Sequence, residues 1–420
     1  MLTATFTALI MIAACTPVQV QIPGQLADFP PQPHRRFIRV GTSDGSQFTD
    51  EQFRFLAANF DYVLFAKFHG GFDIQRQHEA ARRLAELNPE IRAFPYISTK
   101  YWFEQNKWDG PPFDPAWYLR NNEGEIVYRT LRRDDSGSEN VPYVDLANPE
   151  YRKWALSTIR SWLAAAPYAG ISFDAAVPIG DDDDGDFIQW RRRIGQDRLN
   201  AYNAGMRTLL EGAKQLVGED REVIYNGIAP TVVVGPNRNL GLLQVADGAL
   251  NERFCIDAHG QLQTLGDDLH LMERYEDRQL FLRTNYPDDL RQDERERYGR
   301  FCLGSFLLGW RPGLSYYQFG DDYTADQLGN DISVINLPIG SPMGPYQSAG
   351  GLLSRMFTNG ELYVNAGDRP AVVTLSRTLI GVDAGTQPTG LEAGSTITVS
   401  PRDAVFLLDP DATAALERTP

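Results

Sequence analysis

Two acidic residues each close a short apolar run of the sequence. Asp174 ends the run Gly-Ile-Ser-Phe-Asp, and Glu252 follows Gly-Ala-Leu-Asn. If the runs are strands of a (β/α)8 barrel, side chains at their carboxyl ends face the mouth of that barrel. Two carboxylates facing each other there could cleave a glycosidic bond, because one transfers a proton and the other meets the positive charge that develops at the sugar carbon. Each acid alone has a structural alternative: Asp174 capping the next loop, and Glu252 paired with Arg253 at the rim.

The elements that would position these acids follow a strand–helix alternation. Most of the apolar runs are continuous rather than alternating, which is typical of parallel strands that are covered on both faces. Eight such runs lie at residues 37–41, 62–66, 91–97, 170–173, 223–226, 248–250, 280–282 and 314–317. Helical patterns lie between them at residues 49–56, 76–87, 148–166, 187–217 and 291–308. The alternation predicts the α/β class and a (β/α)8 TIM barrel over residues 35–355.

The pattern changes after Arg355. Short, partly alternating runs are separated there by Gly, Asp or Pro, as in residues 362–365, 371–375, 395–399 and 404–408. This indicates antiparallel strands. We expect a small C-terminal antiparallel β-sandwich domain over residues 356–412.

Polar and aromatic residues end several of the predicted strands and could bind sugar hydroxyls and ring faces. Individually, each such residue is more often a packing or solvated side chain than a ligand. The predicted substrate-binding residues are Lys67, His69, Tyr96, Asn226, Arg283, Asn285, Tyr317 and Gln318. The segment 99–145, which follows the third strand and carries Trp102, Trp108 and Trp117, is long enough to be functional.

The amino terminus predicts export. Residues 1–15 are apolar and end in Ile-Ala-Ala-Cys, which resembles the lipobox of bacterial lipoproteins, with Cys15 as the lipidated residue. The stretch is too short to span a bilayer, and an ordinary signal peptide or a disordered terminus are the alternatives. Residues 16–34 are rich in proline and predict a flexible tether. We expect a protein that is lipid-anchored to a bacterial membrane.

Composition excludes other classes of function. The formal charge of −15 over 420 residues argues against a nucleic-acid partner, because phosphate binding needs a basic patch. No metal or cofactor is predicted: the acidic run 181–186 lacks calcium-loop spacing and reads as a solvated helix cap. Cys255 and Cys302 could bridge in an exported protein, but two buried free thiols are the preferred reading.

Three passages together resemble a known family. They are Gly-Ile-Ser-Phe-Asp at 170–174, Asn-Glu-Arg-Phe at 251–254, and the stretch from Leu337-Pro-Ile-Gly to Ser354-Arg-Met-Phe-Thr-Asn-Gly-Glu-Leu-Tyr-Val-Asn365. Over residues 35–408 the chain resembles a family of hypothetical bacterial glycosidases, and distantly the endo-polygalactosaminidases and α-galactosidases. The resemblance implies a (β/α)8 barrel with a C-terminal β domain. It implies that Asp174 is the nucleophile and Glu252 the proton donor, although α-galactosidases have Asp in the second role.

Three hypotheses for function follow. The first is a glycoside hydrolase acting on an oligo- or polysaccharide, with Asp174 as nucleophile or base and Glu252 as general acid/base. The second is a non-catalytic glycan-binding lipoprotein that uses the tryptophan-bearing segment 99–145. The third, a metal-dependent polysaccharide deacetylase, is disfavoured because no His pair has ligand spacing. Sugar, linkage, stereochemistry and oligomeric state stay open.

Overall fold

A computed structural model describes most of the chain in separate stretches. These are residues 36–41, 48–66, 73–102, 112–133, 137–179, 193–228, 239–255, 265–275, 277–284, 291–320, 337–382 and 389–412. The predictions for Cys15, the tether, Lys67, His69, the acidic run 181–186 and Asn285 lie outside the described residues.

All eight predicted runs form strands, and their pairings are parallel. A three-stranded sheet has the order β1-β2-β3, and a six-stranded sheet has the order β11-β10-β9-β8-β7-β4. The strands are β1 (Phe37–Gly41), β2 (Tyr62–Ala66), β3 (Arg92–Phe94), β4 (Tyr96–Ser98), β7 (Gly170–Asp174), β8 (Glu222–Ile228), β9 (Gly248–Asn251), β10 (Gln279–Thr284) and β11 (Ser315–Phe319). The predicted run 91–97 is split by Pro95, so β3 pairs with β2 and β4 with β7.

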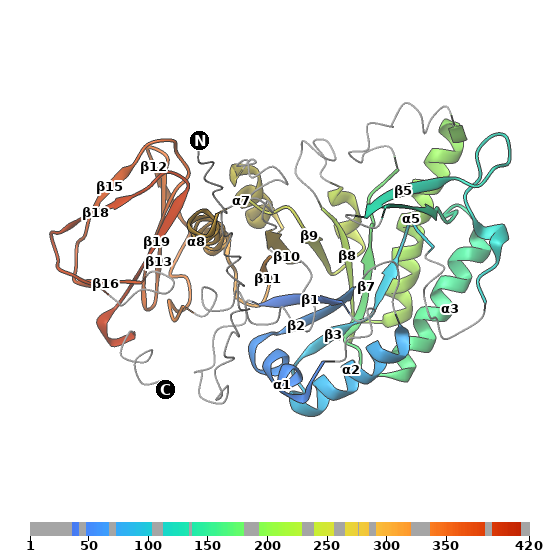
Figure 1. The fold of residues 1–420 in the computed structure, drawn as a ribbon, viewed down its shortest axis with the longest axis horizontal. Helices are drawn as coiled ribbons and strands as arrows, with labels where there is room; N and C mark the ends of the chain where they lie inside the picture. The colour runs from blue at the N-terminus through green and yellow to red at the C-terminus, as the bar shows by residue number, and fades with distance from the viewer. Residues whose placement is uncertain are drawn as a thin grey trace, which may run out of the picture.

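Helices follow most of these strands (Figure 1). They are α1 (Asp50–Asn59), α2 (Ile74–Leu87), α3 (Pro149–Ala165), α5 (Gln196–Val217), α7 (Leu265–Arg274) and α8 (Gln292–Gly309), with 3-10 turns η2 (Pro115–Trp117) and η3 (Leu240–Gln244). Local sequence sets the starts: Thr49 and Gln52 form a capping box at α1, and Asn148 caps α3 ahead of Pro149. The helix α7 was not predicted from the sequence.

Side chains on one face of each parallel sheet pack together, and we call these two faces the inner face. Tyr62 on β2 packs its ring 5.0 Å from that of Phe281 on β10 and 4.4 Å from that of Tyr316 on β11. These contacts join strands of both sheets in one buried cluster. Its members are Phe37, Tyr62, Leu64, Phe94, Ile224, Leu250, Phe281 and Tyr316. Because side chains alternate along a strand, the residue two places further on lies on the same face.

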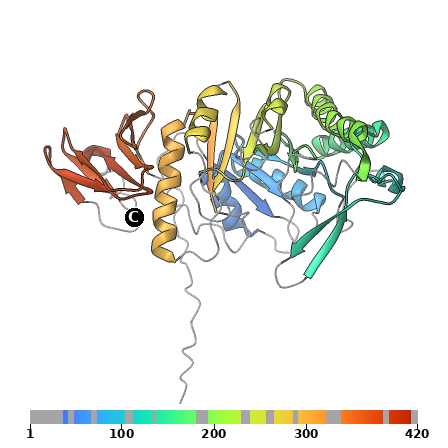
Figure 2. The same cartoon turned by 90° about the horizontal axis from the view of Figure 1, so that it is seen from above.

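The long segment after β4 holds more regular structure than a loop. It contains an antiparallel hairpin of β5 (Tyr128–Arg133) and β6 (Gly137–Pro142), which projects from the body of the molecule (Figure 2). At its base, Trp102 stacks on Phe113 with ring centroids 4.1 Å apart, and Trp117 packs against Trp154 of α3. These aromatic side chains therefore attach the segment to α3.

The C-terminal strands pair antiparallel, in two sheets of order β12-β13-β14-β19-β16-β17 and β15-β18. They are β12 (Gln347–Ala349), β13 (Leu352–Phe357), β14 (Gly360–Asn365), β15 (Ala371–Thr374), β16 (Leu379–Val382), β17 (Thr389–Leu391), β18 (Thr396–Val399) and β19 (Asp403–Leu408). The helix α8 lies between them and the parallel strands (Figures 1 and 2).

Three contacts attach the C-terminal strands to α8. Arg300 makes a two-pronged ion pair with Asp403, at 3.0 and 2.9 Å. Gly304 lets β14 and β19 approach, because a Cβ there would lie 2.6 Å from that of Ala404. Arg355 of β13 donates to the carbonyls of Leu307, Leu308 and Trp310 at the end of α8. Burial and nearby Arg311 lower the pKa of Arg355 to about 10, so it stays cationic at neutral pH.

Two further features bear on the sequence predictions. Cys255 and Cys302 are buried and unbridged. No helix within the described stretches combines the length and apolar character needed to cross a membrane.

Candidate active site

The inner face becomes polar at the carboxyl ends of the strands. Arg39 lies two residues after Phe37 on β1, and Asp174 lies two residues after Ser172 on β7, so each shares a strand face with the earlier residue. Five further polar residues each lie two positions after a member of the buried cluster on the inner face. They are Tyr96, Asn226, Glu252, Arg283 and Gln318. Strand alternation therefore places both predicted acids and four of the predicted binding residues on one face.

Asp174 is held by neutral donors on both neighbouring strands. Asn226 Nδ2 donates to Oδ1 at 2.6 Å, and the Tyr96 hydroxyl donates to Oδ2 at 3.0 Å. Burial, and then the charge of Asp174, raise the pKa of Tyr96 well above its ordinary value, so the phenol keeps its proton and remains a donor. Each carboxylate oxygen of Asp174 thus has a fixed partner.

The backbone after Asp174 is also constrained. Ala175 has φ of 55°, a left-handed conformation that is costly for a residue with a Cβ. Thr99 supports this turn, because its backbone N–H donates to the carbonyl of Asp174 and its hydroxyl contacts the carbonyls of both residues. Asn239 donates to the next carbonyl, that of Ala176. Strain that neighbours hold in place next to a carboxylate marks this turn as a functional candidate.

Glu252 lies in a turn directly after β9. The side chain of Asn251 accepts from the N–H of Arg253 at 2.9 Å, and buried Asp268 of α7 accepts from the N–H of Cys255 at 3.1 Å. The Glu252 carboxylate meets two guanidinium groups, since Oε1 contacts Nη1 of Arg39 and lies 3.3 Å from Nη2 of Arg283. The rim pairing with Arg253 considered from the sequence is therefore not the arrangement seen.

Arg39 connects the two acids. Its Nη1 contacts Glu252, and its Nη2 lies 4.0 Å from Oδ1 of Asp174. The side chain is 8% exposed, against 17% for Asp174 and 33% for Glu252. One guanidinium therefore spans the distance between the two carboxylates.

Arg39 was missed in the sequence, although a signal for it was present. It is a charged residue inside the apolar run Phe-Ile-Arg-Val-Gly, and a buried cation needs an acidic partner. Gln318 of β11 connects to the strand that carries Arg39, because Gln318 Oε1 accepts from the backbone N–H of Arg39 in β1 at 2.9 Å. Gln318 is buried and thus acts between β1 and β11.

Tyr317 lies on the other face of its strand. Its ring stacks on Phe306 of α8 and its hydroxyl donates to Thr284 Oγ1 at 3.2 Å. The prediction that Tyr317 contacts substrate counted residues to the strand end without following the alternation: if Gln318 faces inward, Tyr317 faces the helices. We therefore treat Tyr317 as a packing residue.

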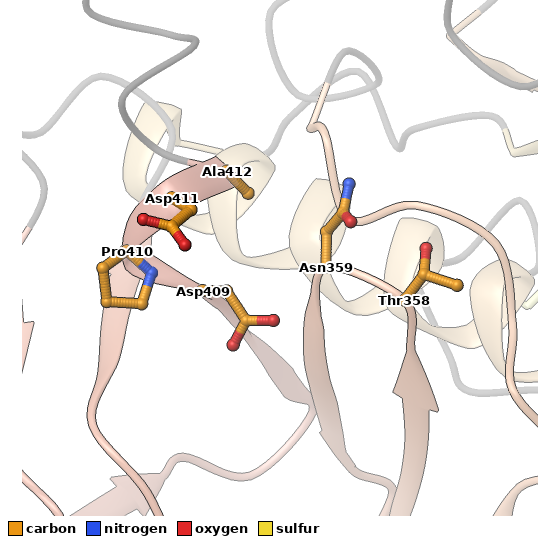
Figure 3. A pocket seen from close by; sticks show the side chains of 6 residues that line it. All are labelled: Thr358, Asn359, Asp409, Pro410, Asp411 and Ala412. Carbon is orange, nitrogen blue, oxygen red and sulfur yellow. The ribbon is translucent and has the colours of Figure 1, made fainter.

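Cavities elsewhere do not include these residues. One of about 520 Å³ lies at the turn between β13 and β14 and the segment after β19, and is lined by Thr358, Asn359, Asp409, Pro410, Asp411 and Ala412 (Figure 3). A groove of about 540 Å³ lies between α3 and α5. At the cavity beside Thr358, the lining residue Asp409 pairs with Arg377, and the lining residue Asn359 donates to the carbonyl of Pro338.

Among the described residues, no three His, Cys, Asp or Glu side chains are grouped to hold a metal ion.

One protein-family model matches this chain. The model of hypothetical glycosyl hydrolase family 15 matches residues 86–361, more than half of the chain, and spans both acids but not Arg39. This confirms the resemblance to hypothetical glycosidases. A search of curated proteins gives no match.

Solved structures of similar fold include an α-amylase from Malbranchea cinnamomea, with 12% identity, TM-score 0.50, and coverage of 90% of this chain and 97% of that one. A debranching enzyme from Nostoc punctiforme has 11% identity, TM-score 0.48, and coverage of 90% and 99%. The glycoside hydrolase domain of PelA from Pseudomonas aeruginosa has 16% identity, TM-score 0.39, and coverage of 69% and 96%. At such identities the α-amylase match shows the fold alone, which is TIM-barrel-like.

Proposed function

Because this chain belongs to hypothetical glycosyl hydrolase family 15, we propose that Asp174 and Glu252 are the carboxylate pair with which it cleaves glycosidic bonds of an oligo- or polysaccharide. The observation that carries the proposal is the shared contact of both carboxylates with Arg39. Two acids that reach one guanidinium also reach one sugar linkage.

We also infer the complete fold around this pair. Gln318 accepts from the N–H of Arg39, and a parallel bridge joins Arg36 to Tyr317, so β1 lies beside β11. Together with the continuity of β3 and β4 across Pro95, this supports closure of the parallel strands into one (β/α)8 barrel. The limits 35–355 for the barrel and 356–412 for a C-terminal β-sandwich belong to the same proposal.

The two acids have different surroundings, and we assign their roles accordingly. Asp174 is the less exposed and is fixed by Tyr96 and Asn226, which suits a nucleophile or base that must stay ionised and in one orientation. Glu252 is twice as exposed and exchanges protons with solvent more readily, which suits the general acid/base. A separation of about 5 Å would make the enzyme retaining, and roughly 6.5–9.5 Å inverting.

The first prediction concerns Asp174→Asn. The amide keeps the shape of the side chain but lacks the charge that stabilises an oxocarbenium-like centre. We expect hydrolysis, measured as reducing ends released from a panel of polysaccharides, to fall by at least about a thousandfold, with folding preserved. Asp50→Asn is the control, since Asp50 is an exposed residue of α1 paired with Arg83. Near-normal turnover by Asp174→Asn would remove the proposal, and binding without product by the wild type would favour a non-catalytic glycan-binding protein.

A further inference from the structure

Two arginines converge on Glu252, and both are buried. The side chain of Arg39 is 8% exposed and that of Arg283 is 7% exposed, and both reach the same oxygen, Oε1. Arginine is seldom buried to this extent without a fixed anionic partner. The strand ends thus contain a small site that is built to hold a carboxylate, and Glu252 occupies it.

This occupancy conflicts with the role of Glu252 as proton donor. A carboxyl group that must donate a proton has to be protonated when substrate is bound, whereas two neighbouring guanidinium groups favour its ionised form. Within the part of the chain that the structure describes, Arg39 contacts both Asp174 and Glu252, and Arg283 contacts Glu252.

A carboxylate on the substrate resolves this conflict. We propose that the natural substrate contains uronic acid units, and that Arg39 and Arg283 bind the carboxylate of such a unit beside the scissile bond. The incoming carboxylate takes the place of Glu252 on the guanidinium pair. Glu252, a third exposed, turns away and takes a proton from solvent, and that proton passes to the leaving oxygen. This inference rests on the proposed function of the acid pair.

Arg283 is the better residue on which to test the proposal. Arg39 also faces Asp174, so its replacement disturbs the nucleophile as well as the anion site. Arg283 contacts Glu252, and the carbonyl of Arg283 accepts from the N–H of Phe254, a main-chain contact that side-chain replacement leaves in place. Arg283→Lys keeps the charge but loses the planar fork that fits a carboxylate.

The experiment compares matched polymers. Polygalacturonate, alginate, hyaluronate and glucuronoxylan are each offered next to the same polymer after chemical reduction of its carboxyl groups, and kcat/KM is measured for every pair. We expect the wild type to prefer the acidic member of the pair it cleaves by about 100-fold or more, because the reduced form has no carboxylate that can replace Glu252 on the two guanidinium groups. Arg283→Gln should lower this preference at least about tenfold, and the preference of Arg283→Lys should lie between those of the wild type and Arg283→Gln. Arg207→Gln, on an exposed pair with Glu211, is the control.

The outcomes separate this inference from the proposed function. Equal cleavage of acidic and reduced polymers, or an equal loss on both in Arg283→Gln, overturns the uronic acid inference and leaves the acid pair in place. Cleavage that persists in Asp174→Asn overturns the acid pair itself. If no polymer is cleaved, gel retardation of the Asp174→Asn protein decides: retention by an acidic polymer and not by its reduced form supports the anion site, and absent or equal retention overturns it.

Discussion

At the scale of single residues, the two hydrogen bonds to Asp174 come from side chains that stay neutral over the working range of pH. Such donors orient a carboxylate without competing for its charge, and each one bound to an ionised acceptor is worth about 1.5–3 kcal/mol. Tyr96 and Asn226 also approach from opposite neighbouring strands, β4 and β8. The carboxylate is therefore clamped from two sides.

A pair of tyrosine variants tests this orientation. Tyr96→Phe removes the donor to Asp174 Oδ2, and we expect kcat to fall by about 10- to 100-fold, from the loss of a hydrogen bond to a charged group. Tyr317→Phe removes a hydroxyl of equal size from the opposite face of β11, and should leave kcat unchanged. Steady-state kinetics of both variants give the answer. An equal effect of the two substitutions would contradict the assignment of faces.

A second polar group lies at the opposite end of the inner face. Glu222 accepts from Gln279 at 2.7 Å and from the hydroxyl of Tyr62 at 3.4 Å, and pairs with Arg92 at 3.1 Å. Burial raises the pKa of Glu222 above its ordinary 4.5 despite the opposing effect of Arg92. The folded protein thus holds this proton more tightly than the unfolded chain does.

The raised pKa of Glu222 predicts the sign of a pH effect. Its contribution to stability is complete below the ordinary carboxyl pKa and is lost as pH rises through the folded value. We expect the free energy of unfolding of the wild type to fall relative to that of Glu222→Gln as pH rises through this window. Urea titrations of both proteins at a series of pH values measure the difference. If the stability of the wild type relative to Glu222→Gln stays constant or grows with pH, burial is not the largest influence on the pKa of Glu222.

At the scale of elements, α8 joins the two kinds of sheet in the molecule. The Arg300–Asp403 pair is mostly buried, so removing one partner leaves a charge with poor solvation. We expect Arg300→Ala to cost about 2–4 kcal/mol of unfolding free energy. Arg207→Ala, which removes an exposed pair within α5, should cost less than about 0.5 kcal/mol. Urea unfolding compares them, and equal costs would mean that the contact between α8 and β19 contributes little.

At the scale of the whole molecule, hydrophobic patterning predicted all eight parallel runs and four C-terminal strands, because burial on both faces leaves a strong local signal. It missed α7, whose apolar positions are interrupted by acids, and the hairpin β5–β6, whose strands carry polar residues. Asp174 and Glu252 could be proposed from the sequence because they end apolar runs. Arg39 was not, because its meaning depends on an acid more than two hundred residues away.

The contact of Arg355 with α8 has a consequence for how the protein is made. Arg355 is added to the growing polypeptide 45 residues after Trp310, whose carbonyl it binds. While the ribosome is between these points, the end of α8 has carbonyl groups that this arginine does not yet cover. The end of α8 is therefore fully hydrogen-bonded only after β13 has been added to the chain.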